Sequence, residues 1–147
     1  MTGPSPRAVP AGRPKGPVLE LTLLPGELSI CRLPPGAGVP AWATPSKVEA
    51  RGPLTSVSWT VEETSVVCAS ALVPMDVQAD SGWRALEVMG PLDLSLTGTL
   101  ASLAWPLAEA GVALFALSAY DTDYVLIKAA SLEPAVAALT AAGHRVR

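Results

Sequence analysis

The sequence predicts an α+β fold made of two related units, of which the first is abbreviated. Half of the 147 residues are apolar and 16% are charged, which is typical of a compact globular chain. Strand-like and helix-like segments alternate regularly between residues 83 and 147. In addition, a motif of strand, acidic turn and strand occurs twice along the chain. Together these observations indicate antiparallel sheets covered by helices.

Residues 1–17 differ in composition from the rest of the chain. Prolines recur at positions 4, 6, 10, 14 and 17, and the basic residues Arg7, Arg13 and Lys15 are not followed by an apolar segment. A signal peptide would need such a segment. We therefore expect residues 1–17 to form a disordered, Pro-rich leader.

The first unit is expected at residues 18–75. It begins with two strand-like segments, VLELTLL and ELSICRL, whose separation by Pro25-Gly26 predicts a hairpin. A helical turn around residues 41–43 and a polar stretch at 44–53 follow, before the strand-like segments LTSVSWT and SVVCAS. Because this unit has a short first helix and no obvious second helix, we expect the other unit to complete it.

The second unit is expected at residues 80–147 and begins with the strand WRALEVMG at 83–90. A helix follows, because apolar residues recur at spacings that place them on one helical face. These residues are Leu100, Leu103, Leu107 and Ala110. Ser95 or Thr97 can cap the start of this helix, and Gly111 should end it.

Strands and a further helix complete the second unit. The segment VALFALS (112–118) is too continuously apolar for an exposed strand, and YVLIK (124–128) is the next strand. A helix runs from the N-cap candidate Ser131 to Gly143, and HRVR closes the chain as a short strand. The resulting βαββαβ order is that of ferredoxin-like domains, in which two helices cover one face of an antiparallel sheet.

An internal repeat supports two related units. A shift of 60 positions aligns Glu63 with Asp123, and a looser match at an offset of 58 sets ELSICRLP beside ALEVMGPL. Chance similarity between short apolar strands is the alternative explanation. The repeat gives Asp123 an acidic counterpart, whereas Asp121 faces Val61 and is sufficiently explained as a turn residue.

Composition argues against two classes of partner. The net charge is −3 and no basic face is evident, so we expect no nucleic-acid partner. The segment from Thr99 to Tyr120 contains only Glu109 as a charge, which imitates a membrane span. However, Pro106, Glu109 and Gly111 in its middle favour a helix followed by a strand, so we expect no membrane partner.

No motif indicates a metal, a cofactor or catalysis. Cys31, Cys68 and His144 do not have metal-ligand spacing, and His144 is expected near the C-terminus without partners. Nucleotide-binding loops and catalytic serine elbows do not occur, so we expect no enzyme. Without a secretory signal, two buried thiols in a cytoplasmic protein are favoured, and a disulfide between Cys31 and Cys68 is the alternative.

Three segments resemble a known family. GPLDLSLTG, PLAEAGV and YDTDYVL are similar to the ACT-domain group to which cytosolic arginine-sensing proteins and small bacterial tandem-ACT proteins belong. When LPGELSICRLPP and SVSWTVEETSVVC are included, only the Pro-rich leader lies outside the resemblance. ACT domains have the ferredoxin-like fold and bind amino acids at the seam between two domains. The resemblance therefore implies two ACT units in one chain and a free amino acid as ligand.

The resemblance also implies where the ligand binds. One part of the site is the loop between the first strand and first helix, and the other is the start of the second strand of the neighbouring domain. The corresponding residues are Asp93, Leu94, Ser95, Leu96, Thr97, Gly98, Val112 and Ala113. Unpaired N–H groups at the helix N-terminus attract a carboxylate. Asp123 matches the acidic position of the family, and the alternative is a turn residue that bonds to nearby backbone.

These expectations describe a small regulatory module that binds an amino acid and acts through the arrangement of its domains. We expect a homodimer, paired through sheet edges or helix faces, and a separate effector protein. The alternative is a structural or protein-interaction module with the same fold, in which Leu94 and Leu96 fill the seam. An additional anionic wall, from Asp93 or Asp121, would favour a basic amino acid.

Overall fold

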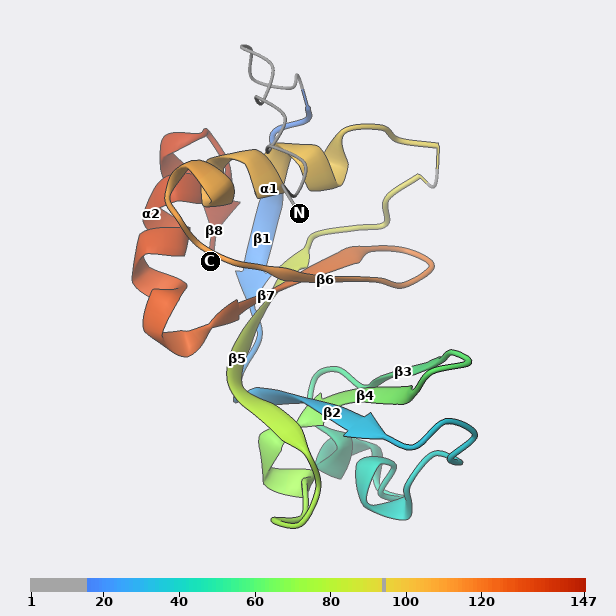
Figure 1. Ribbon diagram of the computed structural model, residues 1–147. Coiled ribbons are helices and arrows are strands. Elements are labelled where there is room, and N and C mark those ends of the chain that lie inside the picture. Colours follow the sequence, from blue (N-terminus) through green and yellow to red (C-terminus); the bar gives the residue numbers. More distant parts are fainter. Residues whose placement is uncertain (1–15, 94) are drawn as a thin grey trace, which may run out of the picture.

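The computed structural model describes residues 16–93 and 95–147, so most of the expected leader and Leu94 lie outside the described residues. Within them, eight strands form one sheet and two α-helices pack on it, which confirms the α+β class (Figure 1). The strands are β1 (Glu20–Leu23), β2 (Leu28–Leu33), β3 (Ser56–Trp59), β4 (Thr64–Ala69), β5 (Ala79–Val88), β6 (Phe115–Ser118), β7 (Asp123–Lys128) and β8 (Arg145–Val146). The helices are α1 (Thr99–Glu109) and α2 (Leu132–Ala141), with short 3-10 helices η1 (Ala41–Ala43), η2 (Val48–Arg51), η3 (Ser70–Leu72) and η4 (Ala129–Ser131).

The long strand β5 runs through both halves of the molecule (Figure 1). Its first residues pair with β2, in the order β3-β4-β2-β5, and its second half lies between β7 and β1. The strand expected at 83–90 therefore begins earlier, at Ala79. The βαββαβ order expected for the second unit is confirmed. The division into units at 18–75 and 80–147 stays a prediction.

The hairpin expected at the start of the first unit is wrong, because β1 and β2 do not pair with each other. Both run antiparallel to β5, with Leu21 opposite Val88 and Leu28 opposite Trp83, and both lie on the side of β5 away from β7. Pro25-Gly26 interrupts the strand without reversing it. The two segments thereby bury Leu21 and Leu28 against one long partner.

The C-terminal strand β8 pairs in parallel with β1 instead of joining β5, so the sheet is mixed and not antiparallel throughout. His144, just before β8, was expected to have no partners, but it is only 4% exposed. Its Nδ1 accepts a hydrogen bond from the N–H of Leu19 at 3.1 Å. Nε2 therefore carries the proton and donates to the carbonyl of Ser102 at 2.9 Å. His144 thus connects α1 to the chain that leads into β1.

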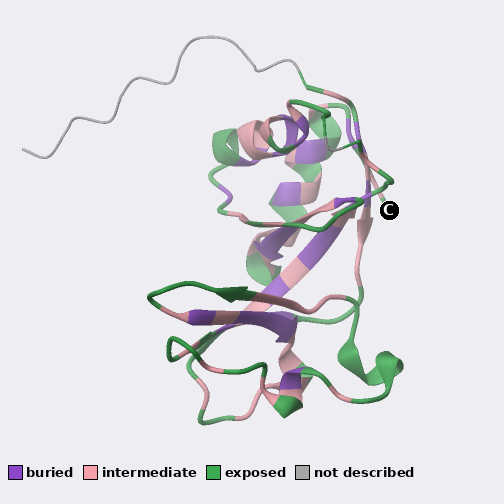
Figure 2. Cartoon of the chain, turned by 90° about the vertical axis from the view of Figure 1, so that its right-hand side faces the viewer, coloured by how far each residue is buried: buried purple, intermediate pink, exposed green. Residues whose placement is uncertain are grey.

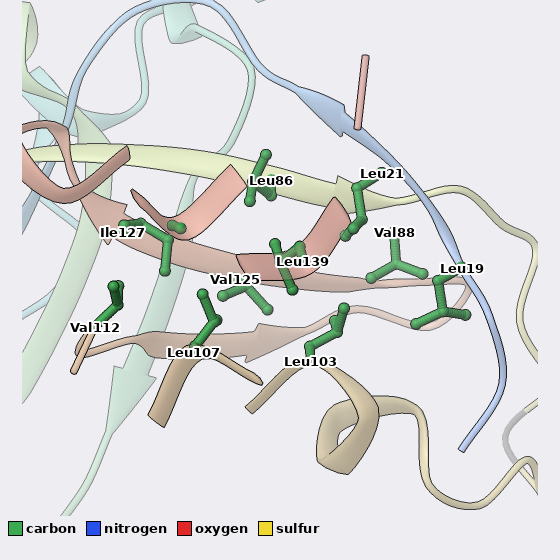
Figure 3. Close-up of a cluster of buried hydrophobic side chains, with 11 residues drawn as sticks. Leu19, Leu21, Leu86, Val88, Leu103, Leu107, Val112, Val125, Ile127 and Leu139 are labelled. Carbon is green, nitrogen blue, oxygen red and sulfur yellow. The ribbon is translucent and has the colours of Figure 1, made fainter. Parts of the chain in front are cut away.

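The largest hydrophobic core lies between the helices and the sheet (Figure 3). Leu103 and Leu107 of α1 and Leu139 of α2 are at most 1% exposed and pack with apolar residues of β1, β5 and β7. Figure 2 shows that buried residues follow the strands and the inner sides of the helices. Leu100, which was expected on the same face as Leu103, is instead 43% exposed in the first turn of α1.

Two smaller cores belong to the first half and to the seam between the halves. At the seam, Leu28 and Val67 pack with residues of β5 and β7, including Trp83, so the halves share a core as expected. In the first half, Cys31 and Cys68 pack with apolar neighbours as buried free thiols, which the expectation favoured over a disulfide. The 3-10 helices η1 and η2 lie between β2 and β3, where the second half has α1, whereas η3 follows β4 as η4 follows β7.

The strand pairing gives the register of the internal repeat. Ser56 lies opposite Val67 and Phe115 opposite Leu126, so hairpins β3–β4 and β6–β7 correspond at an offset of 59, which is 115 minus 56. The expected offset of 60 is therefore wrong by one residue. The offset of 58 is wrong as well. Leu28 lies opposite Ala69 of β4, and Trp83 lies opposite Lys128 of β7. Because Ala69 corresponds to Lys128 at the offset of 59, Leu28 corresponds to Trp83, 55 positions later.

This one-residue correction changes the meaning of the acidic turn. Successive side chains of a strand point to opposite faces, so a slip of one residue exchanges the faces. At an offset of 59, Asp123 corresponds to the buried Thr64, and Glu63 corresponds to Thr122. Asp123 has no acidic counterpart in the first unit.

The segment 112–118 contains a short edge strand and not the buried strand that its composition predicted. Strand β6 covers only residues 115–118, pairs with β7, and alternates between half-buried and exposed positions. Phe115 and Leu117 pack against the seam core, and the intervening alanine is exposed. Of the helices in the described part of the chain, none has the length and apolar character to cross a membrane.

Candidate functional site

A cavity of about 370 Å³ lies where the loop after β5, the start of α1 and the β6–β7 hairpin meet. Strand β5 ends at Val88 and its antiparallel neighbour β7 begins at Asp123, which brings this loop and the hairpin to the same end of the sheet. The described residues that line the cavity are Leu92, Asp93, Leu96, Gly98, Thr99, Leu100, Ala101, Ser118, Ala119, Tyr120, Asp121, Thr122 and Asp123.

The first turn of α1 presents unpaired donors to this cavity. The N-cap residue is Gly98, in the left-handed region at φ 80°, and no side chain caps the helix. Ser102 is the first residue of the helix whose N–H has a partner, the carbonyl of Gly98 at 2.9 Å. The N–H groups of Thr99, Leu100 and Ala101 therefore have no acceptor among the described residues. Such groups, together with the helix dipole, favour a bound carboxylate.

The expectation that Ser95 or Thr97 caps α1 is wrong, because Ser95 bonds to Asp93 and neither side chain caps the helix. The N–H and the hydroxyl of Ser95 donate to Oδ1 of Asp93 at 2.8 and 2.7 Å. The hydroxyl, followed by the backbone N–H, holds the pKa of the Asp93 carboxyl below its ordinary range. Local side-chain bonds of this kind compete with helix capping for the same hydroxyl.

The β6–β7 hairpin is bonded directly to the end of β5. The N–H of Leu92 donates to the carbonyl of Asp121 at 2.6 Å, and the hydroxyl of Thr122 donates to the carbonyl of Val88. Gly90 permits this approach, because a Cβ there would lie 2.7 Å from the carbonyl oxygen of Asp121. These contacts fix the acidic hairpin beside the start of α1.

The two hairpin aspartates have different surroundings. Oδ1 of Asp123 accepts a 2.6 Å hydrogen bond from the hydroxyl of Ser118, whereas the carboxylate of Asp121 has no hydrogen-bond partner in the described part of the chain. Both line the cavity with Asp93, and none of the described lining residues is Lys, Arg or His. The cavity therefore combines a site for an anion at α1 with a site for a cation at the hairpin.

The cavity brings together part of the predicted site. Asp93, Leu96, Gly98 and Asp123 line it, while Ser95 and Thr97 are exposed on the same loop without lining it, and Leu94 lies outside the described residues. Val112 and Ala113 follow the opposite end of α1. A helix of 11 residues separates them from Gly98, which corresponds to about 16 Å.

The residues on the other side of the cavity were not predicted from the sequence. They are Leu92, Thr99, Leu100, Ala101, Ser118, Ala119, Tyr120, Asp121 and Thr122. A signal was nevertheless present, because antiparallel pairing of the predicted strands at 83–90 and 124–128 would place the loop after one beside the turn before the other.

A second cavity, of about 350 Å³, lies between α1, α2 and residues 16–18. Trp105, His144 and alanines of α2 line it, and the indole N–H of Trp105 is buried without a partner among the described residues. None of the predicted site residues contributes to it.

Comparisons with known proteins agree with this fold. The family model of the ACT domain matches residues 78–141. Protein Atu0741 from Agobacterium tumefaciens is 32% identical, with a TM-score of 0.81 over 90% of this chain and 94% of that chain. At 14% identity, VC0802 from Vibrio cholerae, a protein of unknown function and possible transport protein, gives a TM-score of 0.65 over 84% and 89%. No curated protein matches the chain.

A regulatory subunit is also among the similar structures. The regulatory subunit of aspartate kinase from Thermus thermophilus, in a ligand-free form, is 15% identical and gives a TM-score of 0.57 over 86% of this chain and 96% of that chain. At this identity the similarity concerns the fold. Together with the matching family model and the 32% identical relative, it confirms the resemblance found in the sequence: the chain belongs to the ACT-domain family.

Proposed function

We propose that the chain is a regulatory module that binds a free amino acid in the cavity between α1 and the β6–β7 hairpin. One observation above all supports this proposal. The unpaired N–H groups of Thr99, Leu100 and Ala101 share a cavity with the carboxylate of Asp123. An amino acid has the complementary pair of charges, a carboxylate and an ammonium group, attached to the same carbon atom.

Each part of the site has a role in this proposal. The start of α1 donates hydrogen bonds to the ligand carboxylate, and Gly98 has no side chain to obstruct it. Asp123, oriented by Ser118, accepts the ligand ammonium group. A cavity of about 370 Å³ lies within the range of small-molecule sites, roughly 300–1,000 Å³. The loop residues Ser95 and Thr97 shape the approach to it, and Ala113, together with the backbone of the buried Val112, would join the site from a second copy of the chain.

Regulation follows from the elements that the ligand joins. A ligand that contacts both α1 and the hairpin stabilises the arrangement in which both contacts are made, and it shifts the population toward that arrangement. We propose that a separate effector protein responds to this shift, that the chain acts in the cytoplasm, and that it has no catalytic role of its own. The fold shared with a regulatory subunit of aspartate kinase supports a regulatory role.

A homodimer is part of the same proposal. In the described residues, β3 pairs only with β4, and β6 pairs only with β7, so both strands leave one edge unpaired. Unpaired strand edges favour association with another strand. Pairing through such an edge would bring a second copy close to the hairpins. Sedimentation of the chain as a monomer at micromolar concentration would remove this part of the proposal.

The alternative, an interaction module without a ligand, requires that apolar side chains fill the ligand site. Leu96, one of the two residues expected to fill it, is 45% exposed and lines the cavity without closing it. The open cavity supports ligand binding over this alternative.

A thermal-shift survey of the twenty amino acids tests the proposal. We expect at least one amino acid to raise the Tm, since a ligand at 100 times its Kd stabilises the folded state by about 2.7 kcal/mol. Asp123→Ala should remove this shift. Asp76→Ala removes an exposed carboxylate that does not line the cavity, and it should leave the shift unchanged. If no amino acid at millimolar concentration raises the Tm, the binding proposal fails.

A further inference from the structure

The second cavity, between α1 and α2, has a mainly apolar wall and one unpaired hydrogen-bond donor. Its volume is about 350 Å³, and prolines, alanines and Val18 make up most of its lining. Among its polar side chains, the hydroxyl of Ser102 donates to the carbonyl of Thr99, and both ring nitrogens of His144 have partners. The indole N–H of Trp105 is buried and has no partner among the described residues. Buried polar groups normally have one, so this donor indicates an acceptor that the described residues do not supply.

The described part of the chain begins at the edge of this cavity. Gly16, Pro17 and Val18 belong to its lining. Gly16 packs closely on α1, because a Cβ there would lie 2.6 Å from the carbonyl oxygen of Gly98 and 2.6 Å from Cβ of Ser102. The residue before Gly16 is therefore attached beside the cavity. A segment tethered in this way has a local concentration on the order of millimolar, so weak contacts are enough to hold it.

The segment attached there, PAGRPK at 10–15, has backbone chemistry that complements the cavity. It precedes the described residues. Proline has a carbonyl acceptor and no backbone N–H, so this segment offers more backbone acceptors than donors. Proline-rich segments commonly bind in grooves that aromatic side chains line. Trp105 supplies such a ring to the cavity, together with the donor that needs an acceptor.

Charge favours the same segment. Residues 1–15 contain Arg7, Arg13 and Lys15 and no acidic residue. The described lining of the cavity contains the acidic Glu109 and neither lysine nor arginine. Opposite charges attract and orient a tethered segment. This complementarity favours the chain's own leader over a small neutral molecule as the occupant.

We propose that residues 10–15 dock in the cavity between α1 and α2 as an intramolecular proline-rich ligand. A backbone carbonyl of the segment accepts the hydrogen bond of the Trp105 indole, and Arg13 or Lys15 pairs with Glu109. The cavity is thus a recognition site for a proline-rich segment, and the leader of the same chain occupies it. This docking does not depend on the amino-acid site proposed above.

Hydrogen exchange of the tryptophan indole N–H groups tests the docking. We compare the full chain with a full-length variant in which a glycine–serine segment of equal length replaces residues 10–15. The Trp105 indole should exchange at least about tenfold faster in the variant, because it loses its cover and its acceptor. The indoles of Trp59 and Trp83 have acceptors outside the cavity, so their rates should not change. Trp105→Phe assigns the signal.

A charge variant tests the contact with Glu109. Glu109→Gln should speed exchange of the Trp105 indole about twofold to fivefold in the full chain. It should have no effect when the glycine–serine segment is present, because the basic residues of the segment are then missing. Glu49→Gln changes an exposed carboxylate of η2 that does not line the cavity, and it should leave the exchange rate unchanged in both chains.

Two results would overturn the proposal. Equal exchange of the Trp105 indole in the full chain and in the glycine–serine variant would show that residues 10–15 do not cover it. An equal effect of Glu109→Gln in both chains would show that Glu109 does not recognise the segment. Either result leaves the proposed amino-acid site unaffected, because none of these variants changes a residue that lines it.

Discussion

The hydroxyl of Ser118 donates a 2.6 Å hydrogen bond to Oδ1 of Asp123. These two residues form the pair next to the turn of the β6–β7 hairpin. Hydrogen bonds to a carboxylate are short and strong when they are well aligned. This bond fixes one oxygen of Asp123 and leaves Oδ2 without a partner in the described part of the chain. The carboxylate proposed to hold the ligand is thus oriented by the opposite strand before a ligand binds.

Ser118→Ala should weaken amino-acid binding without changing the fold. We expect a loss of about threefold to tenfold in affinity, because the net value of one such hydrogen bond is about 1 kcal/mol. Calorimetric titration with the ligand found in the thermal-shift survey measures this loss. Ser58→Ala, at an exposed position of β3, is the matched control. Affinity equal to that of the unmodified chain would show that Ser118 does not orient Asp123.

His144→Leu should destabilise the chain by about 2–4 kcal/mol, since each buried polar group that loses its partner costs about 1–3 kcal/mol. The substitution leaves the N–H of Leu19 and the carbonyl of Ser102 without the imidazole. Urea denaturation measures the free energy of unfolding. Arg145→Ala is the control, because its side chain is 75% exposed in a 3.5 Å ion pair with Glu20, and it should cost less than about 0.5 kcal/mol. Equal stability of the two variants would contradict a structural role for His144.

The two sides of α1 should respond differently to truncation. Leu107→Ala removes a side chain that is 0% exposed, and comparable buried leucines lose about 2.7–5 kcal/mol of stability. Leu100→Ala changes a side chain that is 43% exposed and lines the cavity. We expect it to cost less than about 1 kcal/mol of stability and to weaken binding of the ligand. Similar unfolding free energies for both variants would place Leu100 in the core after all.

The buried thiols of the first half should make the free energy of unfolding fall at high pH. Burial raises the pKa of Cys31, and burial, followed by the charge of Cys31, raises the pKa of Cys68 from 9.0 to about 12. A raised folded pKa means that the contribution of the neutral thiol is complete below pH 9 and is lost as the pH rises toward 12. Cys68→Ala should reduce this alkaline loss in urea denaturation. An unchanged pH dependence would exclude Cys68 as its source.

The same burial makes the thiols unreactive in the folded chain. Only the thiolate is an efficient nucleophile, so neither Cys31 nor Cys68 should react with a thiol reagent at pH 8 until urea unfolds the chain. Rapid reaction of the folded protein would show that these residues are accessible.

The second unit could be predicted well from the sequence because its signals are local. Apolar spacing in α1, Gly111 at its end and the segment YVLIK each depend on neighbouring residues alone. The partner of β1 could not be predicted in this way. VLELTLL and ELSICRL are compatible with a hairpin, and their shared pairing with β5 depends on residues about 60 positions away in the sequence.

The repeat illustrates a different limit. An offset of 60 aligns the acidic residues Glu63 and Asp123, whereas the strand pairing aligns Thr64 with Asp123. Chemical similarity of two side chains does not determine the register of a strand, because the register follows from which face is buried. The resemblance predicted Asp93, Gly98 and Asp123 at the site, but the contribution of Tyr120 and Asp121 arises only from the meeting of two loops that are distant in the sequence.

Backbone amide chemical shifts of the isotope-labelled chain, with and without a saturating concentration of the amino acid found in the thermal-shift survey, test the central claim most directly. We predict the largest changes at the N–H groups of Thr99, Leu100 and Ala101 and at residues 119–123, because these would contact the ligand. Asp123→Ala should abolish the changes. Changes confined to the second cavity around Trp105, or no changes at saturating concentration, would contradict binding at the start of α1.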